Sequence, residues 1–401
     1  MTFKTLSHKQ FLKDVFLCSL ASYGGPEAHY GIFAHQLIQK RSYITEEELS
    51  ELIGLFSIVP GPSSTQTITA IGYHLGGKKL ALLTFLIWIG PAVLMMSTLG
   101  LFFYFFKGNH LWQNLVTYLP AAAIAFIIYA AINLTRKVVI DLRSLAFFLI
   151  MGILAFLTIA LSVWMVFLLL MLGGILRSLP YWRQGIVKGQ GLNFKWRQAG
   201  WKYVWLIALF AIIFQLLDQW HQPLLSLFAS MYRYGYSVIG GGQVIIPLMI
   251  QDLVKSQHLL TQSDFLTGYA FDQAVPGPLF SFAAFVAARS FADASFGLLI
   301  GILGGLMIFL PGTLLVFFMT PLWQHFRKLS YIKYFLNGVT LTVAALITLT
   351  AITQLTSLPL NLISAIVVLI TTLTLLSKKV PGSLDHRPCY AAWFGDLAKS
   401  G

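Results

Sequence analysis

Long apolar stretches constrain this chain more than any other feature of its sequence. A helix needs about 20 apolar residues to cross the hydrocarbon core of a bilayer, and several of the stretches reach or exceed that length. The chain is 57% hydrophobic and only 10% charged, whereas a soluble domain contains about 25% charged residues. The sequence therefore predicts an all-α polytopic membrane protein in contact with the lipid bilayer. The stretches include 80–106, 115–133, 145–176, 204–217, 298–319 and 360–376.

Charges and cysteines argue against several other classes of protein. The net charge of +13 comes mostly from short loops between the apolar stretches, so it indicates membrane topology and gives no nucleic-acid partner. Cys18 and Cys389 lie at opposite ends of the chain and predict neither a disulfide framework nor a metal site. The N-terminus has no signal-peptide cleavage pattern, and we expect it to remain in the mature protein. No cofactor is predicted.

The second half of the chain repeats motifs of the first half. At an offset of 216 residues, Gly24-Gly25 falls on Gly240-Gly241, and Pro60-Gly61-Pro62 falls on Pro276-Gly277-Pro278. Around Pro91 and Pro311 the offset is 220, which indicates a small insertion. Self-similarity of this kind indicates a duplication. We assign residues 1–159 to a first transporter repeat and 222–379 to a second, with about five spans in each.

Basic residues change sides between the two repeats. The first-half loops at 78–79 and 136–143 are basic, whereas the corresponding second-half loops at 292–295 and 351–361 carry one Asp and no basic residue. Because basic loops stay in the cytoplasm, the repeats are predicted to have opposite orientations. Two further spans within 160–221 bracket a basic cytoplasmic linker, 177–202. The prediction is about twelve crossings of the plasma membrane with both termini, including the tail 380–401, in the cytoplasm.

In each half, one predicted helix is broken by a Pro-Gly-Pro tripeptide. Thr45 with Glu48, and Thr261 with Asp264, resemble capping boxes at the start of that helix. The first proline ends the helix, the glycine supplies a turn, and the second proline suits the first position of the next helix. The free N–H groups and the positive dipole end of that next helix favour an anion. The alternative is a kink without a binding role, against which the two matching copies argue.

The interrupted backbone predicts where a substrate binds. Open backbone groups are tolerated inside a bilayer only where they are buried in protein or face water. Matching interruptions in two inverted repeats are typical of transporters, with the substrate site near the bilayer midplane. The candidate substrate-binding residues are Gly24, Gly25, Pro60, Gly61, Pro62, Ser63, Ser64, Thr65, Gln66, Gly241, Gly242, Pro276, Gly277, Pro278, Ser281 and Arg289.

Few ionisable residues lie in the predicted spans, and each is a candidate because burying it is costly. Arg289 is the best anion ligand, since a guanidinium offers several donors and stays charged. Glu27, His29, His74 and Asp272 are candidates for proton coupling, because burial can raise a carboxyl pKa and imidazole titrates near neutral pH. The alternatives are that His74 and Arg289 snorkel at the membrane surface and that Glu27 only caps the glycine turn.

The doubled motifs, taken in order, resemble those of the chromate ion transporters in their long, two-domain form. The resemblance implies export of chromate, an oxyanion shaped like sulfate, driven by ion gradients. His74 departs from the family pattern, which usually has Arg after the Gly-Tyr of the first half, and Asp272 is not expected in the family. The matching residues are Gly24-Gly25-Pro26 with His29, Pro60-Gly61-Pro62 with Ser63-Ser64-Thr65, Gly72-Tyr73, Gly90-Pro91, Gly240-Gly241-Gly242, Ile246-Pro247-Leu248, Thr261 with Asp264-Phe265, Pro276-Gly277-Pro278 and Pro311.

The residues predict a secondary transporter of a small anion, and the resemblance implies that it exports chromate, with sulfate as a second candidate substrate. A transporter or channel for another small anion is the alternative. An enzyme is not predicted, because the sequence has no HExxH, no GxSxG, no Cys nucleophile placed with a His, and no Walker loop that would also supply ATP hydrolysis. Direction, coupling ion and oligomeric state are not set by the sequence, and a homodimer is an open alternative.

Overall fold

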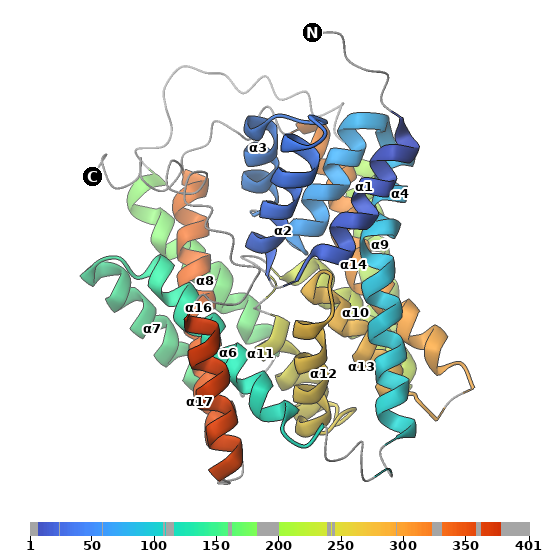
Figure 1. Ribbon diagram of the computed structural model, residues 1–401. Helices are drawn as coiled ribbons and strands as arrows, with labels where there is room; N and C mark the ends of the chain where they lie inside the picture. Colours follow the sequence, from blue (N-terminus) through green and yellow to red (C-terminus); the bar gives the residue numbers. More distant parts are fainter. Residues whose placement is uncertain are drawn as a thin grey trace.

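The computed structural model describes residues 7–23, 25–57, 59–106, 109, 116–158, 163–182, 200–238, 242, 245–293, 295–322, 331–357 and 362–377. All secondary-structure elements in these ranges are helical (Figure 1). The predicted all-α class is therefore confirmed for the described part of the chain. Gly24, Gly241, most of the basic linker and the tail 380–401 lie outside the described residues, and so does the side chain of Glu27.

Five of the described helices are long and apolar enough to cross a membrane. Helix α9 carries no buried residue, so its apolar side chains are exposed around the helix, as expected for a span in lipid. The two helices predicted to bracket the linker are present as α8 and α9. The long helices are α4 (Ser63–Phe105), α6 (Leu119–Val138), α9 (Trp201–Asp218), α14 (Gly297–Met319) and α16 (Tyr331–Ser357), and shorter apolar helices include α7 (Leu142–Thr158), α8 (Val163–Trp182) and α17 (Leu362–Leu376).

Helix α4 reverses direction at Gly76-Gly77, where the backbone is not helical and Gly77 has a φ of 69°. Trp88 Nε1 donates to Thr65 Oγ1 at 3.1 Å, which places the second arm of α4 beside the first. Residues 63–75 and 78–105 therefore run antiparallel. The first arm rises only about 20 Å, less than the hydrocarbon thickness of about 30 Å, so only the second arm is long enough to span.

The short elements occur in the same order in both halves. A helix, a short helix that continues into a π-helix, and a helix that ends before Pro-Gly-Pro follow one another each time. The π-helices begin at Ala34 and Ile250, which matches the offset of the motifs. In the first half the elements are α1 (His8–Ala21), α2 (Pro26–Phe33), η1 (Ala34–Gln39) and α3 (Glu46–Phe56); in the second they are α10 (Pro223–Ser237), α11 (Ile245–Met249), η4 (Ile250–Ser256), α12 (Gln262–Ala274), the 3₁₀ turn η5 (Leu279–Ser281) and α13 (Phe282–Ser290).

Only one of the two predicted capping boxes is complete. The Thr45 side chain accepts from the backbone N–H of Glu48, and the Glu48 carboxylate accepts from the backbone N–H of Thr45. In the second half, Thr261 accepts from the backbone N–H of Asp264. The reciprocal bond is missing there because the Asp264 carboxylate accepts a hydrogen bond from Arg289 instead.

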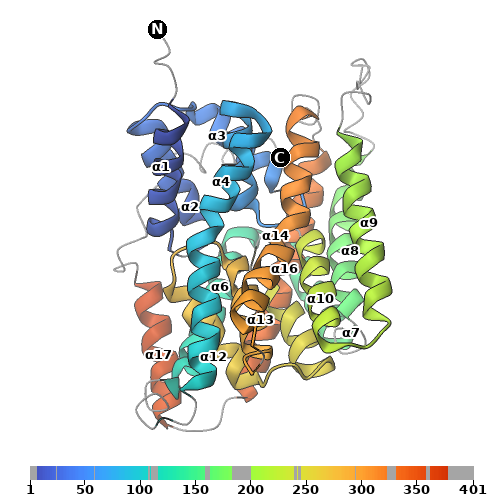
Figure 2. The ribbon, with the colours of Figure 1, turned by 90° about the vertical axis from the view of Figure 1, so that its right-hand side faces the viewer.

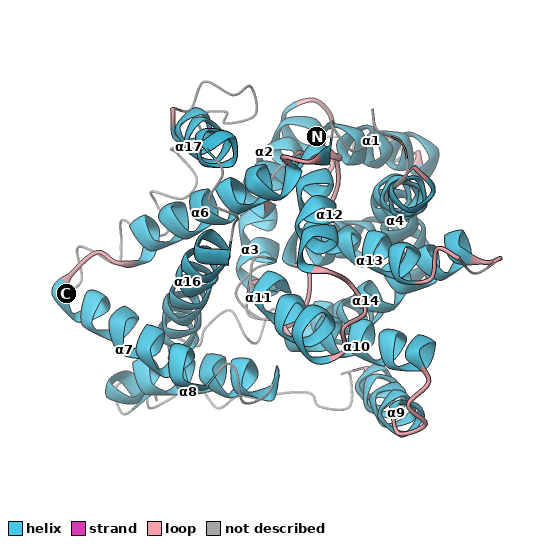
Figure 3. Cartoon of the chain, turned by 90° about the horizontal axis from the view of Figure 1, so that it is seen from below, coloured by secondary structure: helices cyan, strands magenta, loops and turns pink. Residues whose placement is uncertain are grey.

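Small residues let the central helices approach closely. A Cβ atom on Gly304 of α14 would lie 2.4 Å from the Cβ of Ala287 in α13, and one on Gly235 of α10 would lie 2.2 Å from the carbonyl oxygen of Ile308. Close helix pairs in membranes rely on such positions. The elements that carry the motifs gather around α13 and α14, whereas α6, α7, α8, α16 and α17 form the other side of the molecule (Figure 3).

The two helices that precede the Pro-Gly-Pro turns lie toward opposite ends of the molecule. Helix α3 lies at the end nearest the N-terminus, and α12 lies toward the opposite end (Figures 1 and 2). The start of α9 belongs to the N-terminal end as well, because Lys78 Nζ sits 5.5 Å from the centre of the Tyr203 ring. The Pro-Gly-Pro turns lie at the inner ends of α3 and α12, between these two ends.

A candidate substrate site at the two Pro-Gly-Pro turns

Each Pro-Gly-Pro tripeptide forms a turn between two helices, as predicted. Helix α3 ends at Phe56 and α4 begins at Ser63, while α12 ends at Ala274 and η5 begins at Leu279. Gly61 has a φ of 116° and Gly277 a φ of 138°. Side chains other than glycine rarely adopt such backbone angles, which explains the glycine between the two prolines.

Each Pro-Gly-Pro turn makes a backbone hydrogen bond to the opposite half of the chain. The backbone N–H of Gly61 donates to the carbonyl of Val238 at 2.7 Å, and the backbone N–H of Gly277 donates to the carbonyl of Ser22 at 2.6 Å. Ser22 and Val238 occupy the same repeat position, just before the two glycine-rich segments. Each half therefore holds the turn of the other with an equivalent hydrogen bond.

The turns also pack against the proline-containing spans of the opposite half. A Cβ atom on Gly277 would lie 2.4 Å from the Cβ of Ala92, and one on Gly61 would lie 3.1 Å from the Cα of Gly312. Ala92 and Gly312 follow Pro91 and Pro311, which are the positions related by the offset of 220. The two crossed hydrogen bonds and the two close contacts therefore each join the turn of one half to the other half.

Polar side chains after the first turn form a buried cluster with α2 and the second arm of α4. His29 Nδ1 lies 3.0 Å from Ser64 Oγ, and Tyr30 donates to Ser63 Oγ at 3.0 Å. The His29 ring packs edge to face on Trp88 with 5.4 Å between centroids. Trp88 in turn donates to Thr65, as described above. The structure therefore brings His29 and the predicted hydroxyl residues together.

Gln66 joins the first turn to the span of the other half. Its Nε2 donates to the carbonyl of Pro60 at 2.8 Å and to the carbonyl of Gly312 at 3.3 Å. Its Oε1 is buried and has no hydrogen-bond partner among the described residues. An amide that still has an open acceptor beside the turn can bind a ligand hydroxyl or a proton-bearing group.

A buried carboxyl group, that of Asp272, lies near the second turn. Asp272 accepts from Ser281 Oγ at 3.1 Å and from the backbone N–H of Phe282. Its second oxygen, Oδ2, is buried without a hydrogen-bond partner in the described part of the chain. The repeat positions of His29 and Asp272 are occupied by Ile245 and Phe56 in the opposite halves, so neither group has a titratable counterpart at its matching position.

His74 and Arg289 lie at the other ends of the hairpins and not at the turns. His74 Nε2 is 3.6 Å from Glu48, and Arg289 Nη2 is 2.7 Å from Asp264. Each pair joins the start of the helix before Pro-Gly-Pro to the end of the helix after it. Arg289 is therefore about 16 Å from the second turn along α13.

Two buried carboxylates that the sequence analysis did not single out tie the short helices together. Asp14 of α1 accepts from Gln36 at 2.8 Å and from Tyr43 at 2.7 Å, and it pairs with Arg41 at 3.1 Å. In the second half the buried carboxylate is that of Asp252, which occupies the repeat position of Gln36. Asp252 there pairs with Arg233 at 2.8 Å and accepts from Gln257 at 2.9 Å and from Tyr234. Comparing polar residues at matching repeat positions would have found both.

Comparison with known proteins identifies the family. The family model described as "Chromate transporter" matches residues 9–177 and 225–389, on either side of the linker. The chain belongs to this family. Its members are transport proteins and not enzymes, and the match to two regions corresponds to the long form. No solved structure matches the chain significantly.

Relatives of this chromate transporter family member match it over most of its length. The chain is 25% identical over 388 residues to a chromate transport protein of Cupriavidus metallidurans, covering 94% of this chain and 90% of the relative. It is 28% identical over 350 residues to a probable chromate transport protein of Synechococcus elongatus, covering 85% and 83%. An uncharacterized transporter of Methanocaldococcus jannaschii is 22% identical over 375 residues, covering 90% and 87%.

Proposed function

We propose that this chain exports chromate across the cytoplasmic membrane by secondary transport coupled to an ion gradient. Membership of the chromate transporter family and the names of its relatives support the substrate. The crossed hydrogen bonds of Gly61 and Gly277 are the observation that carries the proposal for the site. Sulfate, which has the same tetrahedral shape and charge, is the competing substrate.

The proposal includes inverted repeats. The equivalent bonds at the two turns, and the placement of α3 and α12 toward opposite ends of the molecule (Figure 2), support an approximate twofold relation between the halves. In a bilayer, α3 with the first arm of α4, and α12 with α13, are re-entrant hairpins whose turns meet near the midplane. Such half-length arms do not cross, so fewer spans are needed than the twelve predicted from the sequence.

The site suits an oxyanion that passes between two faces. The helix that begins at Ser63 points its first N–H groups toward the turn, where a bound anion is stabilised. The hydroxyls of Ser63, Ser64 and Ser281 add donors from both halves. His29 and Asp272 exchange protons beside the anion, which couples its movement to the proton gradient. Rocking of one half against the other opens the turns to each face in sequence.

Chromate accumulation in cells tests the proposal. Cells that express the wild-type chain should accumulate less chromate than cells with an empty vector. The double variant Gly61→Ala and Gly277→Ala should accumulate as much as the vector, because alanine is strained at both positive φ angles and its Cβ meets Ala92 at the second turn. Excess sulfate should raise accumulation in wild-type cells if both anions share the site.

Gly54→Ala is the matched control. Gly54 lies in α3, close to the first turn, and a Cβ atom there meets no other atom within 4 Å. This variant should accumulate chromate like the wild type, and membrane fractions should contain equal amounts of all variants. Equal accumulation in wild-type and vector cells would reject chromate export and lead to a screen of other anions.

A further inference from the structure

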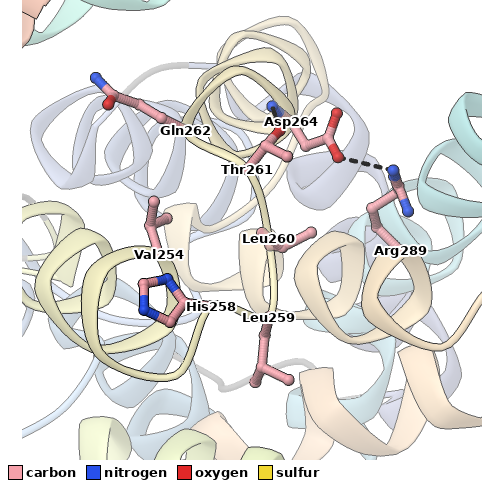
Figure 4. A pocket seen from close by; sticks show the side chains of 8 residues that line it. All are labelled: Val254, His258, Leu259, Leu260, Thr261, Gln262, Asp264 and Arg289. Atoms are coloured by element: carbon pink, nitrogen blue, oxygen red, sulfur yellow. Dashed lines mark hydrogen bonds and ion pairs between the residues drawn. The ribbon is translucent and has the colours of Figure 1, made fainter.

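A pocket lies away from the Pro-Gly-Pro turns, at the outer end of the second hairpin. It has a volume of about 440 Å³ and lies between the loop that joins η4 to α12 and the end of α13 (Figure 4). His258 and Thr261 line it from the loop, Gln262 and Asp264 line it from the start of α12, and Arg289 lines it from α13. The pocket is large enough for a tetrahedral oxyanion together with several water molecules.

Arg289 is fixed in the wall of this pocket. Its Nη2 donates to Asp264 Oδ2 at 2.7 Å, and its guanidinium lies 5.7 Å from the ring centre of Phe103 and 5.4 Å from that of Tyr104. A guanidinium has five N–H donors. Its buried Nε makes no hydrogen bond among the described residues. The side chain therefore has donors to spare while one carboxylate and two aromatic rings hold it in place.

The corresponding position in the first half is built differently. The His74 and Glu48 side chains are 62% and 43% exposed, whereas those of Arg289 and Asp264 are 13% and 8% exposed. An exposed pair at 3.6 Å contributes little. A buried guanidinium keeps its charge at every working pH, and its interaction with an anion is stronger away from water. Of these two matching pairs, only the pair in the second half therefore has a buried cation that stays charged.

We propose that this pocket is a second anion site, on the face of the membrane opposite the N-terminus, which receives the exported oxyanion after it leaves the turns. Arg289 donates to Asp264 while the pocket holds no anion and to the oxyanion when one is bound, with the Thr261 hydroxyl as a further donor. The carboxylate of Asp264 competes with the anion, which keeps the affinity low and lets the anion leave. The direction of passage rests on the proposed function; the anion site itself does not.

Sulfate binding to the purified, full-length protein tests the site directly, by calorimetry with sulfate as the probe. Asp264→Asn removes the competing charge but keeps the shape, so sulfate should bind about tenfold more tightly or better. Adding Arg289→Gln to this variant should abolish the gain. Glu48→Gln, at the matching place of the first half, should leave the affinity unchanged. Unchanged affinity in a folded Asp264→Asn variant would overturn the proposal.

Breaking a buried ion pair is costly, so the Asp264 and Arg289 variants could fail to fold. A second measurement therefore uses the wild-type protein. Right-side-out membrane vesicles are treated with an arginine-specific dicarbonyl reagent, and modification of Arg289 is followed by mass spectrometry. Sulfate added outside should slow the modification at least about threefold, and chloride at equal ionic strength should not. Equal rates with both salts would overturn the site. If sulfate slows the modification of Arg289 but the protein does not export chromate, the anion site is supported and the proposed function is rejected.

Discussion

At the residue scale, Asp272 and His29 are two titratable side chains of the described residues that lie beside the turns. Asp272 is held by Ser281 and retains a buried oxygen without a partner among the described residues, and His29 contacts Ser64 and Trp88. Ionisable groups at membrane depth usually serve transport. The sequence could predict these candidates because they are rare in apolar stretches. It could not predict that Asp264 pairs with Arg289, since 25 residues and a turn separate the two.

Replacing Asp272 with Asn should uncouple flux from the pH gradient, because an amide cannot take up or release a proton. In proteoliposomes, the acceleration of chromate flux by a pH gradient should fall about tenfold or more, while flux without a gradient changes less. Asp293→Asn is the matched control, because Asp293 is exposed in the turn after α13. A wild-type response to the pH gradient in Asp272→Asn would exclude this carboxyl as the coupling group.

At the element scale, the hairpins depend on glycines at helix contacts. A Cβ on Gly304 would lie 2.4 Å from Ala287, whereas one on Gly90 of α4 meets nothing within 4 Å. The helices and their breaks could be predicted from local chemistry, since proline, glycine and Thr45 act within one turn of themselves. The loop predicted at 78–79 matches the reversal at Gly76-Gly77. The pairing of the two arms of α4 could not be predicted, because it depends on the contact between Trp88 and Thr65.

Gly304→Ala should therefore destabilise the folded protein by about 1–3 kcal/mol, because α13 and α14 must move apart. Gly90→Ala should be neutral or stabilising by up to about 1 kcal/mol, since alanine favours a helix interior over glycine. Thermal unfolding of both variants in the same detergent measures the difference. If Gly304→Ala unfolds at or above the temperature of Gly90→Ala, the close packing of these two helices is not a source of stability.

At the scale of the whole molecule, the two halves are joined by equivalent bonds that no local motif contains. The sequence could predict a duplication and a change in the side of the basic loops, because both predictions rest on patterns along the linear chain. It could not show that the Gly61 turn binds the carbonyl of Val238, or that the Gly277 turn binds that of Ser22, because these contacts cross between halves. The proposed inverted relation of the two halves predicts that the two hairpins start from opposite faces of the membrane.

Single cysteines should reveal this relation in intact cells. With Cys18 and Cys389 replaced by serine, Ser256→Cys reports the loop before α12, and Glu46→Cys reports the start of α3; both positions are exposed. An impermeant maleimide should label Ser256→Cys in intact cells but should reach Glu46→Cys only after permeabilisation, because the basic Lys78 and Lys202 at the same end as α3 favour the cytoplasm. Labelling of both cysteines from the same side would exclude inverted repeats. Labelling from opposite sides would mean that the two hairpins enter the membrane from opposite faces and that their turns lie between these faces. It would also put the Arg289 pocket on the outer face, where an exported anion leaves.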